Sequence, residues 1–371
     1  MMRAPRFRYH AAKSVRDAVA ALADGGPGAM LLAGGTDLVP NMKRRQQVPE
    51  LVIGIRGIGR LRRIANGEGL TIGSCVTLSE IAGHRKVRKG YAALAKAAGS
   101  VATPPLRNMG TLGGNLCLDT RCNYYNQSHE WRQAIDYCMK APRSTGGHAC
   151  TSPDGASICW VATSSPRCWA VSSTDTAPAL IALGAEVTLV GPGGERRIPL
   201  EQLYHNDGMA YLTKRPDEMV TEVHLPDGEG RRAKSEGRRA KSEGRRAKSE
   251  GLRSTYWKLR RRGSFDFPVL GVAAAVRLAG PGDGGTGGRA PVVEEARIVL
   301  GAVASRPVLV PEAAMLVGKP LTDALIREFA EVAARHARPL DNTDFDLAWR
   351  KKVATSYVVG ALKELRADPR D

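Results

Sequence analysis

The stretch from Thr111 to Cys168 places a glycine motif directly before a concentration of cysteines. The motif Thr111-Leu-Gly-Gly-Asn115 is followed by six of the seven cysteines of the chain, the last of them at position 168. Paired glycines let backbone N–H groups approach a ligand closely, and cysteine thiolates are soft ligands for metal ions. This juxtaposition predicts two redox cofactors bound near each other, and electron transfer is the first function to consider.

Between Asp119 and about Ser173 the sequence shows neither helical nor strand periodicity. It is polar, aromatic and rich in Gly, Pro, Ser and Cys, with too few aliphatic side chains to hold itself by packing. A loop of this length inside a compact domain is usually functional or disordered. An odd total of cysteines argues against a complete disulfide framework, and clustered thiols in a reducing compartment more often bind metal or do redox work.

The N-terminus carries charge but lacks the apolar core of a secretory signal, and no apolar run approaches the roughly 18 residues of a membrane span. We therefore expect a cytoplasmic protein with no membrane partner.

The remainder of the chain has regular patterning. Ser14 is expected to cap a helix that ends at Gly25-Gly26, and Thr77 or Ser79 to cap a second short helix. Before the cysteine-rich segment, strands are predicted at 30–33, 51–55 and 70–72 and a helix at 92–98. After that segment, a helix is predicted at 177–183 and strands at 186–190 and 222–225. Beyond residue 251 the pattern predicts a separate α+β unit, with strands at 255–259, 272–278 and 295–300 and helices at 324–334 and 349–365.

The net charge of +18 has a partly local origin. The unit Gly-Arg-Arg-Ala-Lys-Ser-Glu occurs three times in tandem from Gly230 to Glu250, and the three copies account for +6 of that charge. Few aromatic residues accompany the remaining charge for base stacking, so nucleic acid is an unlikely partner. We expect the repeats to form an exposed basic loop, and Gly280–Gly288 to form a glycine-rich turn.

A second glycine motif, Ala33-Gly-Gly-Thr-Asp-Leu38, follows a predicted strand. Successive N–H groups in such a loop form a nest suited to a pyrophosphate, although the motif matches neither a Walker loop nor G-x-G-x-x-G. Because Thr111–Asn115 has the same chemistry, we expect one extended nucleotide to lie across both loops.

Together with these loops, three further motifs carry a family resemblance: Asp175-Thr-Ala-Pro-Ala-Leu180, Tyr256-Trp-Lys258 with Asp266-Phe-Pro268, and Leu300-Gly-Ala-Val-Ala-Ser-Arg-Pro307. The chain resembles the FAD-binding medium subunit of the xanthine dehydrogenase and carbon monoxide dehydrogenase family. The resemblance implies an α+β fold, with a two-part FAD-binding domain of the vanillyl-alcohol-oxidase/PCMH type and a smaller α+β C-terminal domain. It implies a division into residues 1–228 with an iron–sulfur insert at 119–173, a repeat loop at 229–251, and a C-terminal domain at 252–366.

The same resemblance implies which residues contact FAD. The loop from Leu31 to Leu38 would hold the diphosphate, Asp175 would hydrogen-bond the cofactor, and Lys258 would lie near the flavin. Asp37 has an alternative role as a loop-capping acid. The full implied set is Leu31, Leu32, Ala33, Gly34, Gly35, Thr36, Asp37, Leu38, Val101, Ala102, Thr111, Gly113, Gly114, Asn115, Asp175 and Lys258.

The cysteine-rich segment resembles one branch of this family. Arg121-Cys-Asn-Tyr-Tyr-Asn-Gln-Ser128, Trp131-Arg132 and Tyr137-Cys-Met-Lys140 are similar to the β subunit of 4-hydroxybenzoyl-CoA reductase. In that branch the insert carries a [4Fe–4S] cluster on four cysteines. The resemblance implies Cys122 and Cys138 as the first two ligands and Cys168 as the fourth.

The third ligand has two candidates. Cys159 lies nine positions before Cys168, which suits the family spacing, and Cys150 is the alternative. Trp160 stands where the family often has a histidine. Four thiolates suit tetrahedral zinc as well as an iron–sulfur cluster, although zinc sites usually show close C-x₂₋₄-C pairs and none occurs here. Cys117 and Cys75 are interpreted as packing thiols.

The resemblance thus implies an oxidoreductase subunit with FAD and a [4Fe–4S] cluster, in a molybdenum-containing aryl-CoA reductase. Its expected partners are a molybdenum-cofactor subunit and a [2Fe–2S] subunit in a heterotrimer that dimerises, and a ferredoxin-like donor that feeds electrons through the cluster and FAD. Substrate chemistry would lie on a partner subunit. The alternatives are an FAD subunit of an aerobic molybdenum hydroxylase with outward electron flow, and a basic protein that binds nucleic acid through the repeats.

Overall fold

A computed structural model describes residues 3–141, 158–227, 251–279 and 290–367. The tandem repeats, the Gly280–Gly288 segment and Cys150 lie outside the described residues. In the described part of the chain, no helix is both long and apolar enough to cross a membrane.

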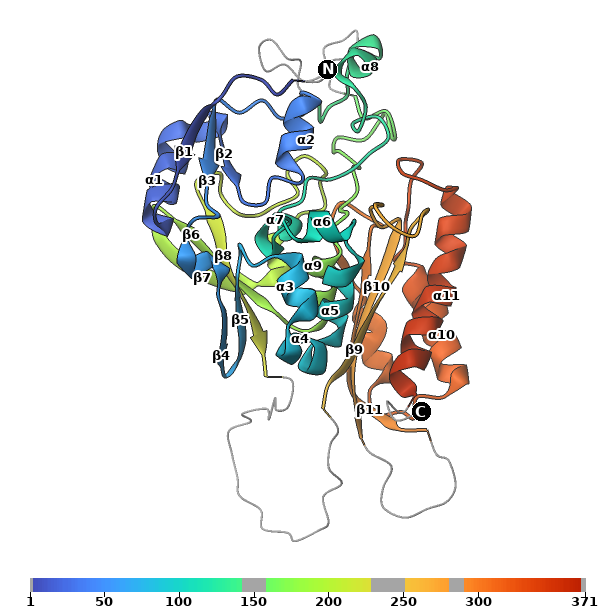
Figure 1. Ribbon diagram of the computed structural model, residues 1–371. Helices are drawn as coiled ribbons and strands as arrows, with labels where there is room; N and C mark the ends of the chain where they lie inside the picture. Colours follow the sequence, from blue (N-terminus) through green and yellow to red (C-terminus); the bar gives the residue numbers. More distant parts are fainter. Residues whose placement is uncertain (1–2, 142–157, 228–250, 280–289, 368–371) are drawn as a thin grey trace.

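The N-terminal lobe is a small parallel sheet with one helix against it (Figure 1). Its strands, in the spatial order β1-β3-β2, are Arg8–Ala11, Leu51–Gly54 and Ala29–Leu32. Helix α1 (Val15–Gly25) begins at the Ser14 cap, whose hydroxyl accepts from the Asp17 amide, and it packs its apolar face on this sheet. The short helix α2 (Leu38–Lys43) follows the β2 strand and the first glycine motif.

A five-stranded antiparallel sheet forms the second part of the FAD-binding region. Its order is β4-β5-β8-β6-β7, with strands Ile64–Gly67, Gly69–Gly73, Met219–Pro226, Glu186–Gly191 and Gly194–Pro199. Helices on one side of it share its main core, namely α3 (Leu78–Gly83), α4 (Arg85–Gly90), α5 (Ala92–Ser100) and α9 (Thr176–Ala182). The Thr77 side chain caps α3 in a capping box with Glu80, which resolves the choice between Thr77 and Ser79.

The C-terminal unit is an antiparallel sheet covered on both faces. Its order is β12-β11-β10-β9, with strands Val308–Leu309, Val292–Gly301, Leu270–Ala279 and Arg253–Leu259. Successive side chains of β10 point to opposite faces: Ala273 and Ala275 join the core with α5 and α9, whereas Val272 and Ala274 join the core with α10 (Asp323–Ala334) and α11 (Leu347–Arg366). Figure 1 shows α5 and α9 lying between the two larger sheets.

Several elements of the structure differ from the sequence expectations. Residues Leu112–Leu116, expected as a loop, form the short helix α7, because the Thr111 hydroxyl caps it by accepting from the Gly114 amide. A helix, α8 (His129–Ala134), lies inside the segment expected to lack periodicity, and Ser128 caps it. Strand β7 was not predicted, because its exposed charged residues hide the alternation. Helix α6 (Pro104–Arg107) precedes the second glycine motif.

Candidate functional site

The two glycine motifs face a common cavity of about 640 Å³. Its walls come from the end of β2, from α2, from α7 and from the residues before α9. Every residue that the family resemblance implies for FAD lines this cavity except Lys258. The structure therefore brings together segments that are about 80 and 140 positions apart in the sequence.

Close backbone approach explains the glycines. A Cβ on Gly34 would overlap the carbonyl oxygen of Met109, two residues before the second motif, so only glycine lets the two loops touch. Gly35 has a φ of +71°, a conformation that side chains disfavour. In the described part of the chain, the backbone N–H groups of residues 34–37 donate to no backbone carbonyl, which leaves them available to an anion.

In the second motif, the side chain of Asn115 is engaged by protein rather than directed wholly at the cavity. Its Oδ1 accepts from the Thr176 amide at 3.0 Å and from the Thr174 hydroxyl at 2.9 Å. These bonds attach α7 to the start of α9. Asn115 thus joins two walls of the cavity and retains its amide nitrogen for a ligand.

The Asp37 side chain does not cap helix α2. It stands at the N-cap of α2 without a side-chain capping bond, and it forms an ion pair with Arg121 instead. The Asp37 Oδ2 accepts from the Asn41 amide at 3.0 Å, and the Arg121 guanidinium lies 4.4 Å from the centre of the Phe267 ring. Burial raises the pKa of Asp37, while the Arg121 charge opposes that shift.

Arg121 is a cavity residue that the sequence analysis did not assign to FAD. Its side chain is 4% exposed, and its Nε has no hydrogen-bond partner within the residues that the structure describes. A buried cation with an unused donor suits a polar or anionic ligand group. The one sequence feature that could have pointed to Arg121 is its position directly before Cys122. Other residues that line the cavity, and that the sequence did not assign to FAD, include Asn41, Asp119, Tyr211, Phe265 and Phe267.

Lys258 lies behind the cavity wall and pairs with Asp175. Its Nζ is 2.9 Å from the Asp175 Oδ2 and 3.1 Å from the Ser100 carbonyl, and the Tyr256 hydroxyl donates to the Asp175 Oδ1 at 2.8 Å. Burial raises the pKa of Asp175, and the Lys258 charge counteracts it. This pair ties strand β9 to the start of α9, so Lys258 positions Asp175.

Two residues that line the cavity have unusual backbone conformations. Ala102 has a φ of +41° and Phe265 a φ of +70°, and the Phe265 amide donates to the Ala102 carbonyl at 3.1 Å. Strained conformations of this kind occur where the surrounding structure needs a particular geometry. Here they bring the residues before β10 against Val101 and Ala102.

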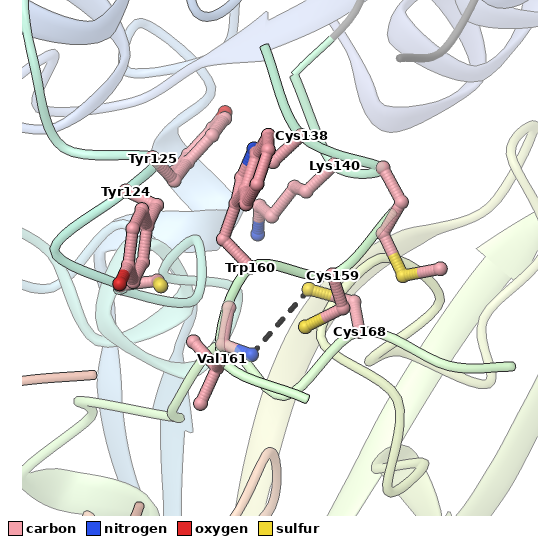
Figure 2. A pocket seen from close by; sticks show the side chains of 11 residues that line it. Tyr124, Tyr125, Cys138, Lys140, Cys159, Trp160, Val161 and Cys168 are labelled. Carbon is pink, nitrogen blue, oxygen red and sulfur yellow. Dashed lines mark hydrogen bonds between the residues drawn. The ribbon is translucent and has the colours of Figure 1, made fainter. Parts of the chain in front are cut away.

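A second, much smaller cavity of about 10 Å³ lies within the cysteine-rich segment. Four cysteines line it, namely Cys122, Cys138, Cys159 and Cys168, and all four are buried. Figure 2 shows three of them around the cavity with Tyr125, Lys140 and Trp160. The dashed line in Figure 2 is the hydrogen bond from the Ala170 amide to the Cys168 Sγ, at 3.4 Å.

The cysteine segment is fixed to the rest of the chain by polar contacts. Gln46 donates to the Tyr125 carbonyl at 2.6 Å, and the Asn123 amide donates to the Asn342 carbonyl at 2.8 Å. Arg132, fully buried, donates to the Arg44 carbonyl. The Trp160 Nε1–H donates to the Tyr137 carbonyl.

The four cysteines that line this cavity are donors of the type that a thiolate-bound metal centre uses. Burial raises the pKa of Cys122 to about 11 and of Cys168 to about 12, so a positive charge is needed to hold these groups as thiolates. In the described residues, no group of three or more His, Cys, Asp or Glu side chains is arranged to hold a metal ion. Four cysteine thiols are the donor set by which proteins hold an iron–sulfur cluster.

The other two described cysteines lie apart from this cavity. Cys75 is buried in the core beneath α1, where burial raises its pKa to about 11, and this confirms it as a core thiol. Cys117 packs against the main core and lines the larger cavity, with its pKa raised by burial.

Two family models match this chain in succession. Residues 5–228 match the FAD-binding domain in molybdopterin dehydrogenase, and residues 254–365 match the C-terminal domain of the carbon monoxide dehydrogenase flavoprotein. Together they confirm the predicted fold, an FAD-binding domain followed by the smaller C-terminal domain.

Individual relatives agree with these matches. The FAD-binding subunit of aldehyde oxidoreductase from Escherichia coli strain K12 is 30% identical over 287 residues, 76% of each chain. The FAD subunit of nicotinate dehydrogenase from Eubacterium barkeri is 26% identical over 345 residues, 91% of this chain and 87% of that one. A solved structure of carbon monoxide dehydrogenase from Hydrogenophaga pseudoflava superposes with a TM-score of 0.69 at 26% identity, over 98% of both chains. This chain belongs to the family of FAD-binding medium subunits of the xanthine and carbon monoxide dehydrogenases.

Proposed function

We propose that this chain is the FAD- and [4Fe–4S]-carrying electron-transfer subunit of a molybdenum-containing aryl-CoA reductase. Membership in the family accounts for an oxidoreductase subunit that binds FAD. The cluster, the aryl-CoA substrate class and the inward direction of electron flow are the parts that we add.

One observation carries the proposal: four cysteines from a segment of little regular structure line one buried cavity. Core thiols scattered for packing alone have no reason to meet in this way. We choose Cys159 as the third ligand because it lines the cavity with the other three cysteines. Cys150 lies outside the described residues and stays the alternative. The four proposed ligands are Cys122, Cys138, Cys159 and Cys168.

When bound, FAD exchanges one or two electrons and an iron–sulfur cluster exchanges one, so the pair can link one-electron and two-electron chemistry. The chain's own residues bind and shield both groups. The N–H groups of residues 34–37 would receive the diphosphate, while Arg121 would face a polar group of the cofactor. The aromatic residues around the thiols, Tyr124, Tyr125 and Trp160, would limit water at the cluster.

The aryl-CoA assignment depends on the likeness of residues 121–140 to the 4-hydroxybenzoyl-CoA reductase β subunit. The proposed partners are a molybdenum-cofactor subunit and a [2Fe–2S] subunit in a dimerised heterotrimer, with a ferredoxin-like donor. Substrate chemistry would take place on the molybdenum subunit, since this chain supplies cofactor sites only.

A second candidate is the FAD subunit of a hydroxylase or dehydrogenase with outward electron flow. It is favoured by the relatives reported above, which are named as aldehyde oxidoreductase and nicotinate dehydrogenase subunits. In this case the cysteine segment would bear zinc or no metal.

Metal and flavin analysis of anaerobically purified protein separates the two candidates. The proposal predicts about four irons per FAD and an electron paramagnetic resonance signal after reduction. Zinc, or flavin without metal, would refute the cluster and favour the second candidate. Addition of a reduced ferredoxin should then reduce the flavin of the wild-type heterotrimer, and removal of one cavity cysteine should abolish that reduction.

A further inference from the structure

The wall between the two cavities contains a buried ion pair with a fixed direction. Asp119 lines the larger, flavin cavity and Lys140 lines the smaller, cysteine cavity. Their charged atoms are 2.6 Å apart, and each side chain is only 6% exposed. The positive end therefore faces the thiols and the negative end faces the flavin site.

Lys140 has little freedom to leave this position. Its Nζ donates to the Gly208 carbonyl at 2.8 Å and also to the Thr120 hydroxyl, and it lies 4.8 Å from the centre of the Tyr125 ring and 5.3 Å from that of Tyr211. Gly208 is itself packed against the cysteine cavity, because a Cβ there would lie 2.8 Å from the Cys168 Sγ. The ammonium is thus fixed by groups that also border the cluster site.

Asp119 is held at its own end of the pair. Its Oδ2 accepts from the Tyr125 hydroxyl at 3.0 Å, and its other oxygen accepts from Lys140. The second charged pair in this wall, Arg121 with Asp37, has both members on the flavin side. Among the described residues that line the cysteine cavity, Lys140 is the one with a cationic side chain.

A charge at a buried position strongly affects the reduction potential of a nearby redox centre. Adding an electron to a buried centre adds negative charge, which a nearby cation stabilises and a nearby anion destabilises. Water screens little here, since both side chains are buried. Lys140 should favour the reduced state of the cluster, whereas Asp119 should disfavour the reduced state of the flavin.

We propose that the Lys140–Asp119 pair is a positioning element that sets the difference in reduction potential between the cluster and FAD. The inference builds on the proposed function, because it needs a cluster on the four cysteines. Lys140 touches neither reacting atoms nor substrate in this account, and it acts through its fixed charge.

The test is an equilibrium redox titration of the anaerobically purified protein, with the cluster followed by electron paramagnetic resonance and the flavin by absorbance. Lys140→Met removes the charge and keeps the length of the side chain. At the potential that half-reduces the wild-type cluster, we expect at least a tenfold lower ratio of reduced to oxidised cluster, which is about 59 mV for one electron. The flavin should shift less. Lys140→Arg, which restores a cation, should recover most of the shift.

Asp119→Asn gives the opposite change, with the flavin easier to reduce and the cluster less affected. Lys96→Met is the matched control, since Lys96 is ion-paired but lines neither cavity. If Lys140→Met protein is unstable, the Asp119→Asn/Lys140→Met double variant removes the unpaired charge and should bring both potentials closer to wild type than either single variant does.

The outcomes distinguish this inference from the proposed function. Iron bound at four per flavin with no cluster shift in Lys140→Met beyond that of Lys96→Met would overturn the inference alone. Equal shifts at both centres would also overturn it, because they indicate a general structural change. Protein without iron would overturn the proposed function and the inference together.

Discussion

The flavin cavity and the cysteine cavity are built in different ways. The flavin cavity is lined by β2, α2, α7 and the residues before α9, and β2, α7 and α9 pack into the two apolar cores of the FAD-binding region. The cysteine cavity is lined by turn and loop residues, and its local apolar cluster consists largely of the four cysteines and the aromatic residues beside them. The large apolar cores hold the flavin cavity in shape. The cysteine cavity has few such contacts, so its order depends largely on the cysteines themselves and on what they bind.

Because of this difference, we expect the loss of a bound group to affect the two cavities differently. Removing a cofactor from the flavin cavity leaves two packed cores in place, so the fold should persist. Removing a centre from the cysteine cavity leaves buried thiols with raised pKa values and few aliphatic contacts. Changes in one cavity should therefore leave the content of the other intact.

The largest expected effect is the loss of the cluster in Cys168→Ser. Replacing one ligand thiolate should lower the iron content from about four per flavin to below one, with FAD content unchanged, because Cys168 does not line the flavin cavity. Iron and flavin are counted in the same anaerobic sample. Cys75→Ser is the matched control and should keep both groups; equal iron in the two variants would show that Cys168 is no ligand.

Gly34→Ala is expected to lose FAD and to keep its iron. A Cβ at Gly34 overlaps the Met109 carbonyl, so the two glycine loops must separate and FAD should bind at least tenfold more weakly, with iron retained. Flavin dissociation is measured by fluorescence on dilution. Gly57→Ala has open space at the new Cβ and should bind FAD as the wild type does. Iron lost together with flavin in Gly34→Ala would break the proposed independence of the two cavities.

A smaller effect is expected from Lys258→Met, on the flavin side. Asp175 would remain buried without its partner, which costs about 3–5 kcal/mol of unfolding free energy. Urea unfolding measures this loss. Lys363→Met removes the exposed pair with Asp323 and should cost less than about 1 kcal/mol. Similar losses in both variants would show that Lys258 has no special role in joining β9 to α9.

The smallest effect concerns acid stability in the sheet of the FAD-binding domain, away from both cavities. Arg196 binds Glu218 through two hydrogen bonds of 2.8 and 2.9 Å and lowers the pKa of Glu218 from 4.5 to about 2. Because the folded pKa is depressed, this stabilisation is fully present above about pH 4.5 and is lost as the pH falls toward 2. Allowing for solvent screening at Arg196, its size is on the order of 1–2 kcal/mol. Glu218→Gln should show a flatter fall in melting temperature between about pH 6 and pH 3; parallel curves would contradict it.

Sequence reasoning grouped most of the residues that line the larger cavity, because glycine motifs after strands have local causes. Ser14, Thr77 and the paired glycines act on neighbours within a few positions. It missed Arg121, whose partner Asp37 lies 84 positions away, and it could not foresee that Lys258 would pair with Asp175 behind the cavity wall. Pairings over such distances are decided by tertiary packing.

The cysteine segment was predictable in its chemistry but hardly in its structure. The resemblance implied Cys122, Cys138 and Cys168 as ligands, with Cys159 or Cys150 as the third, and the structure places Cys159 with the other three around one cavity. Helix α8 escaped because six residues are too few to show a period, although the Ser128 cap was visible in the sequence. The Lys140–Asp119 pair has no sequence signature, since it needs both cavities to be in place.

The most direct test of two separate centres in one chain is anomalous diffraction at the iron absorption edge, from crystals of anaerobically purified protein. The account predicts a single iron peak for four atoms, bounded by Cys122, Cys138, Cys159 and Cys168, and FAD density across the two glycine loops. A zinc peak, no metal peak, or iron ligated by Cys150 in place of Cys159 would contradict it.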